Sequence, residues 1–561
     1  MNNPTRLILR TVAVAGLLIA SGLFPKPGYG QLNAGGTPLT SRSDVTVQNI
    51  PVVTVSPPDL AALQLRDAQE PLPYRFAVNI PVQADFPEEG AWTTLADGSR
   101  VCLLAVEAPG AKAVSLLFDR FRLPDNGRLF IYSADRKQVL GAYTSINNDA
   151  SGRFSAQLIH AGRVILEYDA PASSPLPEIR LCDVVYAYRG VPDEDEAKGF
   201  GQAGPCEVNI NCEEGQAYQQ VKKGIVRVQA YKNSSAYWCT GSLVNNTRRD
   251  GSPYLLTADH CYKGGTPADL LNWVFYFDYE TTGCENPTLP PQERALTGAT
   301  FKARAGDVSA GGSDFLLLLL NDAIPDTFDV FLNGWSRINT QPLYGAGIHH
   351  PQGDIKKIST YTEKGTSTSW TGGSIYTHWL ITWAETLNGH GVTEGGSSGS
   401  PVFNSEKLIV GTLTGGGSAC DSASLTEPDY YGKFSYSWLS NGSDSASRLQ
   451  PWLDPDSTGV ETLEGKPVSV KEIASAGGVT VYPNPAGEVL FVKRDAAAGK
   501  GLSTMSLYDS RGILVRTAAG PEPGMTAALD LSGCPPGLYL VVLSTDRGNV
   551  TKKIVKYGWK R

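Results

Sequence analysis

Histidine is scarce in this sequence, with six among 561 residues, so few side chains can act as a general base near neutral pH. The nine cysteines contain no C-x-x-C pair, and this absence argues against a metal site among them. The net charge of −8 argues against nucleic acid as a partner. Apart from the short stretch Thr11–Phe24 there is no candidate for a membrane-spanning segment.

The N-terminus has the pattern of a secretory signal. Arg6 and Arg10 supply positive charge, the apolar stretch follows, and small residues at Gly28 and Gly30 predict cleavage near Gln31. We therefore expect a signal peptide over residues 1–30 and an exported monomer. Whether the exported chain is released or attached to the cell surface stays open.

Cysteines in an exported chain are typical of disulfides. Two lie in the N-terminal third, six in the middle and one in the tail: Cys102, Cys182, Cys206, Cys212, Cys239, Cys261, Cys284, Cys420 and Cys534. The first two groups are even and can pair within separate domains. This distribution predicts a Cys102–Cys182 bridge and leaves Cys534 over.

Composition divides the chain into β-rich units, and the fold class is all-β. Residues 31–75 are rich in Pro, Thr, Ser and Asn and read as a linker or poorly ordered leader. Residues 75–190 alternate apolar and polar positions, and an acidic linker follows at Gly190–Gly204. The many short strands of residues 199–460 predict a barrel or sandwich. A linker over 461–478 precedes a small β domain at 479–561.

The segment Gly391–Phe403 contains a serine framed by glycines, in GSSGSP. Glycines allow a tight turn whose amide N–H groups point outward. A serine there can attack a carbonyl while the amides bind the resulting oxyanion. A flexible hairpin loop is the alternative for this motif by itself.

A serine nucleophile needs a base, and the base needs an orienting acid. His260 ends an apolar strand in LLTADHC, where a Cys239–Cys261 bridge would fix its loop. Asp314 opens a run of leucines, and an acid there is costly to bury unless it is paired. The order His260, Asp314, Ser398 is that of the chymotrypsin-like fold.

TADHC, SDFLLLL and GSSGSP resemble the trypsin-like serine protease superfamily, and within it the bacterial lysyl endopeptidases. The likeness covers about residues 201–460 and includes PCEVNINC and SRLQPWLDPDSTG. It implies a chymotrypsin-like double β-barrel that needs no metal or cofactor, with the triad His260, Asp314 and Ser398 and an oxyanion hole of the Gly396 and Ser398 amides. It also implies three disulfides, Cys206–Cys420, Cys212–Cys284 and Cys239–Cys261.

The same resemblance implies substrate-binding residues. Asp429 matches the aspartate that faces a substrate lysine, and Trp370 matches a tryptophan that lines the active site; the acids Asp421 and Glu427 compete for the first role. The family's histidine near that tryptophan is replaced by Thr414. The alternatives are therefore an Arg or mixed preference, or a non-catalytic binding or adhesion protein of the same fold.

Activation follows from the residue before the nucleophile. Trypsin-like zymogens commonly have an aspartate there that binds a freed N-terminus, whereas this chain has Ser397. We expect activation by removal of a propeptide, residues 31–198, with Lys198–Gly199 suited to self-cleavage by a lysine-specific enzyme. Whether the propeptide acts as a folding chaperone, an inhibitor or both stays open.

The tail carries YPNP, LYDSRG and PPGLYLV. It resembles the C-terminal sorting domain of the Bacteroidetes type IX secretion pathway, and the resemblance implies that the type IX machinery is a partner. A carbohydrate-binding or adhesion module is the alternative.

Overall fold

The structure is a computed structural model. It describes residues 34–42, 49–70, 73–191, 202–286, 291, 294–306, 308, 311–370, 376–468, 479–495, 503–509, 514–545 and 548–556. The signal peptide, the cleavage site at Lys198–Gly199 and most of the linker around it lie outside these residues. Within them, no helix is long and apolar enough to cross a membrane.

The N-terminal unit is a sandwich of two sheets. One sheet has the strand order β1-β4-β9-β6-β7, with β3 on β4, and the other includes β2-β10-β5-β8. Their inner faces share one core, which includes Leu104, Leu116, Ile131 and Val184. The strands are β1 (Val52–Thr54), β2 (Tyr74–Phe86), β3 (Ala91–Thr94), β4 (Arg100–Glu107), β5 (Ala113–Arg122), β6 (Arg128–Ser133), β7 (Val139–Tyr143), β8 (Phe154–Ser155), β9 (Arg163–Ala170) and β10 (Glu178–Ala187).

The expectation of an unstructured leader over residues 31–75 is wrong for part of that range. β1 pairs with β4 in parallel, and helix α1 (Leu60–Gln69) begins at the N-cap Asp59, whose side chain accepts from the Ala62 amide. The helix is fixed to the sandwich by the buried Asp67, which binds Arg75 at 2.6 Å. The Pro-rich and Thr-rich composition of residues 31–75 gives no sign of this ion pair, which depends on the folded structure.

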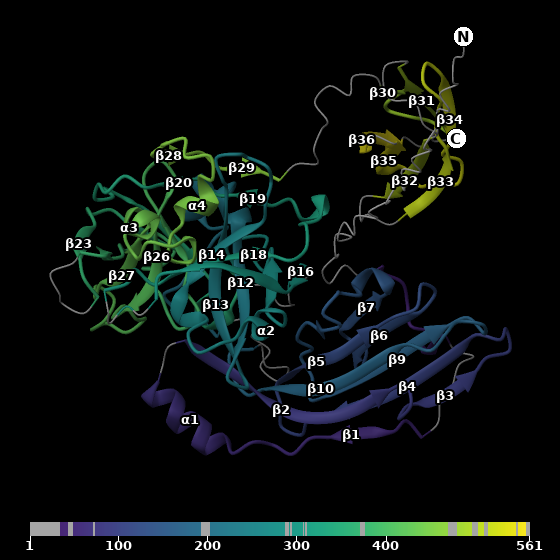
Figure 1. The fold of residues 1–561 in the computed structure, drawn as a ribbon, viewed down its shortest axis with the longest axis horizontal. Coiled ribbons are helices and arrows are strands. Elements are labelled where there is room, and N and C mark those ends of the chain that lie inside the picture. Colours follow the sequence, from purple (N-terminus) through teal and green to yellow (C-terminus); the bar gives the residue numbers. More distant parts are fainter. Residues whose placement is uncertain are drawn as a thin grey trace, which may run out of the picture.

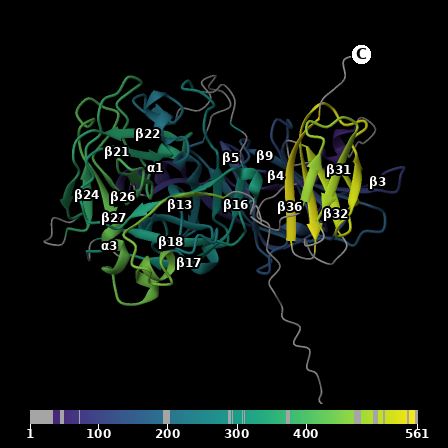
Figure 2. The ribbon, with the colours of Figure 1, turned by 90° about the horizontal axis from the view of Figure 1, so that it is seen from above.

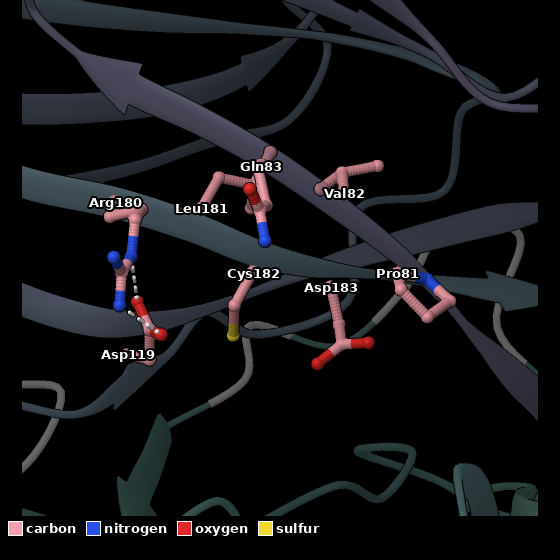
Figure 3. A pocket seen from close by; sticks show the side chains of 8 residues that line it. All are labelled: Pro81, Val82, Gln83, Asp119, Arg180, Leu181, Cys182 and Asp183. Carbon is pink, nitrogen blue, oxygen red and sulfur yellow. Dashed lines mark hydrogen bonds and ion pairs between the residues drawn. The ribbon is translucent and has the colours of Figure 1, made fainter.

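The predicted Cys102–Cys182 bridge is also wrong, since both thiols are free. Cys102 lies inside the sandwich core, whereas Cys182 packs against a different core on the other face of its sheet. A bulge between Leu181 and Asp183 brings Cys182 and Asp183 to that outer side. Figure 3 shows Cys182 there beside Asp183, lining a pocket of about 620 Å³. The two side chains therefore belong to opposite faces and cannot meet.

The central unit contains two sets of strands that follow one pairing rule. In each set the first strand pairs with the second and fourth, and the sixth pairs with the third and fifth. The first set is β12 (Ile225–Lys232), β13 (Ser235–Val244), β14 (Tyr254–Ala258), β15 (Val274–Phe277), β17 (Ala299–Arg304) and β18 (Phe315–Leu320). The second is β21 (Gly345–His349), β22 (Lys357–Tyr361), β24 (His378–Ile381), β25 (Pro401–Phe403), β26 (Ile409–Gly416) and β27 (Asp429–Lys433).

This repeated order is that of a chymotrypsin-like double β-barrel, so the predicted fold class is confirmed. Figures 1 and 2 show the first set in teal beside the second in green. The remaining elements of the central unit are β11 (Val208–Asn209), α2 (Pro267–Leu270), β16 (Arg294–Thr297), β19 (Phe331–Leu332), β20 (Trp335–Ser336), β23 (Thr366–Thr368), α3 (Phe434–Leu439), α4 (Gln450–Leu453), β28 (Thr462–Leu463) and β29 (Lys466–Pro467).

The disulfides and the C-terminal boundary of the central unit can be compared with the sequence predictions. The three disulfides implied by the family resemblance are present: Cys206–Cys420, Cys212–Cys284 and Cys239–Cys261. The linker predicted over 461–478 begins later than expected, because β28 pairs with β20 and β29 pairs with β19. The central unit therefore includes residues 462–467.

One long strand joins the N-terminal sandwich to the first barrel. The beginning of β2 pairs with β13, with Tyr74 opposite Trp238 and Val78 opposite Ser235, while the rest of β2 pairs with β10. Figure 1 shows β2 and β10 running from the sandwich to the barrel. Phe76 stacks on Trp238 with ring centroids 4.2 Å apart, inside a core to which both units contribute. The two units are thus one continuous sheet at this point.

The C-terminal unit is a small sandwich. One sheet has the order β30-β31-β34 and the other the order β33-β32-β35-β36. A shared core includes Leu490, Leu507 and Val541, and it also encloses the free thiol of Cys534. The strands are β30 (Val479–Tyr482), β31 (Val489–Arg494), β32 (Thr504–Asp509), β33 (Leu514–Ala519), β34 (Thr526–Asp530), β35 (Gly537–Thr545) and β36 (Gly548–Lys556).

Candidate active site

His260 and Asp314 are brought together at the open end of the first barrel. β14 leads into a turn of 3-10 helix, Asp259–Cys261, which the Cys239–Cys261 disulfide ties to β13. His260 Nδ1 lies 2.7 Å from Asp314 Oδ2, and the His260 amide donates to Asp314 Oδ1 at 3.0 Å. Both carboxylate oxygens therefore bind the same residue, which fixes the imidazole relative to the acid.

Asp314 is held in place by its backbone as well. It lies directly before β18, is 1% exposed and has a φ of +57°, a left-handed conformation that aspartate tolerates better than most residues. Its carbonyl accepts from the Asp259 amide at 3.0 Å. The preceding carbonyl of Ser313 lies so close to Gly432 that a Cβ there would come within 1.7 Å of it. The acid thus occupies the seam between the two barrels.

A second set of charges surrounds this turn. Arg304 binds both oxygens of the buried Asp259, at 2.6 and 2.9 Å, and the Lys232 ammonium donates to the His260 carbonyl at 2.5 Å. Burial lowers the pKa of Lys232 to about 8 and raises the pKa of Asp259 to about 6, against the opposing effect of Arg304. The residues that flank the imidazole are therefore fixed from both sides.

Ser398 lies on a turn that packs against the strand leading to His260. Gly396 and Gly399 on either side have φ of +99° and +84°, which only glycine adopts readily. The Ser398 carbonyl accepts from the Thr240 amide at 2.8 Å. A Cβ on Gly399 would lie 2.6 Å from the Ala258 nitrogen, so a side chain could not fit there. His260 Nε2 is buried and has no hydrogen-bond partner within the described part of the chain.

Asp429 begins β27 and is fully buried. Its Oδ2 accepts from Trp383 Nε1 at 2.6 Å and from the hydroxyls of Thr393 and Ser418 at 2.7 Å each. Oδ1 accepts from the Ser418 amide at 3.3 Å and points toward Gly416, where a Cβ would lie 2.0 Å from it. Oδ1 therefore faces the space that an absent side chain leaves over Gly416, which is itself exposed.

Trp370 is half-buried between two rings. Its centroid lies 5.2 Å from that of Tyr430 and 6.2 Å from that of His378. His378 Nε2 forms a hydrogen bond of 3.0 Å with the Thr414 hydroxyl. Thr414 replaces the histidine that the family has near this tryptophan, but a different histidine, His378 of β24, lies beside Trp370 and contacts Thr414. The competing acids Asp421 and Glu427 are exposed and form no part of this cluster.

Comparison with known proteins agrees with this geometry. Residues 200–432 match the family described as lysyl endopeptidase, C-terminal domain, and residues 480–557 match the secretion system C-terminal sorting domain. A lysyl endopeptidase of Pseudomonas aeruginosa is 27% identical over 372 residues, which are 62% of this chain and 76% of that protein. The chain is a serine endopeptidase, and its central unit is similar to lysyl endopeptidases.

Two solved structures are also similar to this endopeptidase. The thermostable serine protease AL20 from an extremophilic microorganism is 17% identical, with a TM-score of 0.27 over 38% of this chain and 91% of the other. The Vibrio cholerae VesB protease is 11% identical, with a TM-score of 0.28 over 62% and 98%. Both TM-scores are low, and it is the strand order of the central unit that identifies the double barrel. The sorting domain directs the endopeptidase to secretion or to the cell surface.

Sequence reasoning missed several side chains of this endopeptidase's site. Thr393 and Ser418 contact Asp429, His378 contacts Thr414, and Lys232 contacts the His260 carbonyl. The partners in these contacts lie 11 to 36 residues apart along the chain. Thr393 also lies five residues before Ser398. Its place in the VTEGGSSGS run was the one available signal for these four.

Proposed function

We propose that this endopeptidase cleaves on the carboxyl side of lysine through a Ser398–His260–Asp314 triad, and that it is made as a zymogen. The observation that carries the triad is the double hydrogen bond between Asp314 and His260, because it leaves Nε2 as the one ring nitrogen able to accept a proton. Ser398 Oγ attacks the scissile carbonyl carbon while His260 Nε2 takes the hydroxyl proton. Asp314 accepts a hydrogen bond from Nδ1–H, stays ionised and stabilises the imidazolium.

The remaining steps follow from the same groups. The amides of Gly396 and Ser398 are the proposed donors to the oxyanion of the tetrahedral intermediate. When this intermediate collapses, the carbon–nitrogen bond breaks and His260 returns the proton to the leaving amine. Water then attacks the acyl-enzyme with His260 again as the base, which releases the acid product and restores Ser398.

The lysine preference rests on Asp429. A carboxylate that is shielded from solvent attracts an ammonium strongly. Oδ1 accepts fewer hydrogen bonds than Oδ2, so it can accept another from the ammonium. Thr393 and Ser418 each donate a hydroxyl hydrogen bond to Oδ2. Ser418 Oγ accepts from the Thr393 amide, so one lone pair of Ser418 and the lone pairs of Thr393 are left to accept from the substrate ammonium. The compact ammonium of lysine suits this cluster of oxygens better than a planar guanidinium does.

The zymogen proposal is supported by the position of β2. Its first residues occupy the edge of β13, whose continuation at Thr240 binds the Ser398 carbonyl. Tyr74 lies against Gly395, where a Cβ would come within 2.7 Å of its ring, and donates to Gln352 Oε1 at 3.4 Å. The N-terminal sandwich therefore covers the residues next to the nucleophile, and a polypeptide cannot bind along this edge while β2 is paired. This favours an inhibitory role for the propeptide.

Self-processing is tested with the inactive full-length chain. We expect purified Ser398→Ala to stay uncut at Lys198–Gly199, and to be cut there when active wild-type enzyme is added, because the linker bond is a lysyl bond. N-terminal sequencing of the products gives the site. Efficient cleavage at Lys198 in the pure inactive preparation would contradict self-processing.

Inhibition by the sandwich is tested at its main anchor. We expect Phe76→Ala to weaken the bound propeptide about 100-fold or more, because truncating a buried phenylalanine costs about 3–5 kcal/mol. Activity toward a short lysyl amide should appear sooner after processing than in wild type. Trp92→Ala is the matched control, since Trp92 is an exposed aromatic residue on β3. Equal time courses for wild type and Phe76→Ala would exclude an inhibitory role for this contact.

A further inference from the structure

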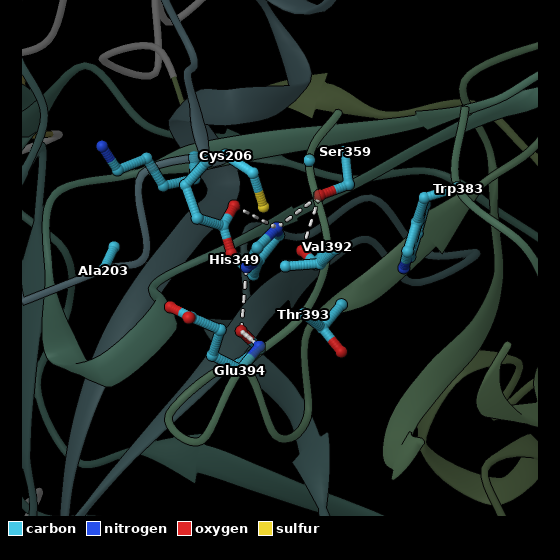
Figure 4. Close-up of polar contacts among 12 residues, drawn as sticks. Ala203, Cys206, His349, Ser359, Trp383, Val392, Thr393 and Glu394 are labelled. Carbon is cyan, nitrogen blue, oxygen red and sulfur yellow. Dashed lines mark hydrogen bonds and ion pairs between the residues drawn. The ribbon is translucent and has the colours of Figure 1, made fainter. Parts of the chain in front are cut away.

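A series of buried hydrogen bonds, called the His349 relay below, ends on Ser397, the residue before the proposed nucleophile. It runs through His349, the last residue of β21, and Ser359 in β22. His349 Nδ1 lies 2.8 Å from Ser397 Oγ, and Nε2 lies 3.0 Å from Ser359 Oγ. Ser359 Oγ lies 2.7 Å from the Val392 carbonyl. Figure 4 shows His349 between Ser359 and the turn that carries Glu394.

The direction of every proton in this chain is determined. The Val392 carbonyl can only accept, so the Ser359 hydroxyl donates to it and must accept from His349 Nε2. In a neutral ring with the proton on Nε2, Nδ1 is an acceptor, and the Ser397 hydroxyl donates to it. Ser397 Oγ in turn accepts from the Glu394 amide at 3.2 Å.

A neutral ring is consistent with its surroundings. The His349 side chain is fully buried, and burial together with the positive charge of Lys357 lowers its pKa to about 3. The carboxylate of Glu207 lies 3.9 Å from Nε2, beyond hydrogen-bond distance. The Glu207 side chain is itself fully buried, and its pKa is raised well above the usual value by desolvation.

These bonds fix a backbone segment with a proposed catalytic role. The Ser397 amide donates to the Glu394 carbonyl, and its own carbonyl accepts from the Ser400 amide, each at 2.9 Å. Together with the two side-chain bonds, to His349 and to the Glu394 amide, four hydrogen bonds hold Ser397 between Gly396 and Ser398. All members of the relay lie within the two barrels, and none is supplied by a freed N-terminus.

We propose that His349 is a positioning residue for the oxyanion hole: oriented by Ser359, it binds the Ser397 hydroxyl and so holds the Gly396 and Ser398 amides in place before the propeptide is removed. This inference rests on the proposed function of those amides. It assigns to an internal histidine the task that a freed N-terminus performs in zymogens with an aspartate before the nucleophile. Processing then uncovers a site that is already formed.

The kinetic test uses two variants that differ in the atom they retain. In His349→Asn the side-chain oxygen replaces the Nδ1 acceptor, whereas His349→Gln places its amide near Nε2 and leaves the Ser397 hydroxyl proton without its acceptor. We expect His349→Gln and Ser397→Ala to lower kcat about 10–100-fold with KM changed less than about threefold, because a displaced amide costs transition-state binding. His349→Asn should recover most of kcat. Ser400→Ala, in the same turn but outside the relay, is the control.

A second measurement does not depend on the activity of the variant that is measured. In the unprocessed Ser398→Ala chain, amide hydrogen exchange over residues 394–400 should be slow and should stay slow after added wild-type enzyme removes the propeptide. Adding Ser397→Ala or His349→Gln should speed it at least about tenfold. The proposal is overturned if both variants leave kcat and exchange unchanged, or if protection arises only after processing. If wild type hydrolyses no peptide, but exchange in the unprocessed chain is slow and speeds in Ser397→Ala and His349→Gln, the proposed function fails and the relay stands.

Discussion

Asp314→Asn is expected to lower kcat for a lysyl peptide amide by about 10⁴-fold, the loss typical of this change in a serine protease triad. The structure determines why the amide would be harmful. Oδ1 accepts from the His260 amide, so the asparagine oxygen must take that place and its NH₂ group must face His260 Nδ1. Nδ1 then becomes an acceptor, the proton moves to Nε2, and the ring can no longer accept from Ser398.

The control for this prediction is Asp322→Asn. Asp322 is also a buried acid. It follows the C-terminal end of β18, whereas Asp314 precedes the N-terminal end, so Asp322 lies away from His260. The activity of Asp322→Asn should stay within about twofold of wild type, because a substitution away from the triad does not change the groups that take part in the chemical step. Circular dichroism and thermal melting confirm that both variants fold. A kcat for Asp314→Asn within tenfold of wild type would exclude Asp314 as the orienting acid.

The His260–Asp314 contact, the serine turn and the barrels could be predicted because their signals are local. The strand before His260 is apolar except for Thr257, and β18 is an uninterrupted apolar run. An acid at the start of this run is costly unless it has a partner nearby. The serine turn is visible from its glycines, since Gly396 and Gly399 adopt positive φ. The disulfide pairings were different: they came from the family resemblance, because spacing does not determine connectivity.

What could not be predicted depends on contacts between distant segments. The pairing of β2 with β13 joins residues about 160 positions apart, and each strand alone is compatible with any edge. The failed Cys102–Cys182 bridge has the same origin. Period-two alternation predicts which residues share a face, but the bulge after Leu181 shifts that alternation and places Cys182 outside. Ser397 is visible in the GSSGSP motif, but its bond to His349, 48 residues away, carries no sequence signal.

Asp429→Asn is expected to lower kcat/KM for a lysyl peptide amide on the order of 10³-fold, because losing one partner of a buried charge pair costs about 2–5 kcal/mol. Wild type should prefer the lysyl over the matched arginyl amide, and the variant should lose most of that preference. The neutral amide retains one oxygen for Trp383, Thr393 and Ser418, which preserves the fold better than alanine would.

Two measurements make this result decisive. Asp421→Asn and Glu427→Gln remove the competing acids and should each leave the lysyl-to-arginyl ratio within about twofold of wild type, because exposed charges are screened by solvent. Reaction of each variant with a small phosphonate that labels Ser398 counts the folded, competent sites independently of the specificity pocket. If labelled Asp429→Asn keeps the wild-type ratio, or if wild type cuts both amides equally, Asp429 is not the lysine-binding group. A shifted ratio in Glu427→Gln instead would assign recognition to that exposed acid, on the rim and not at the base.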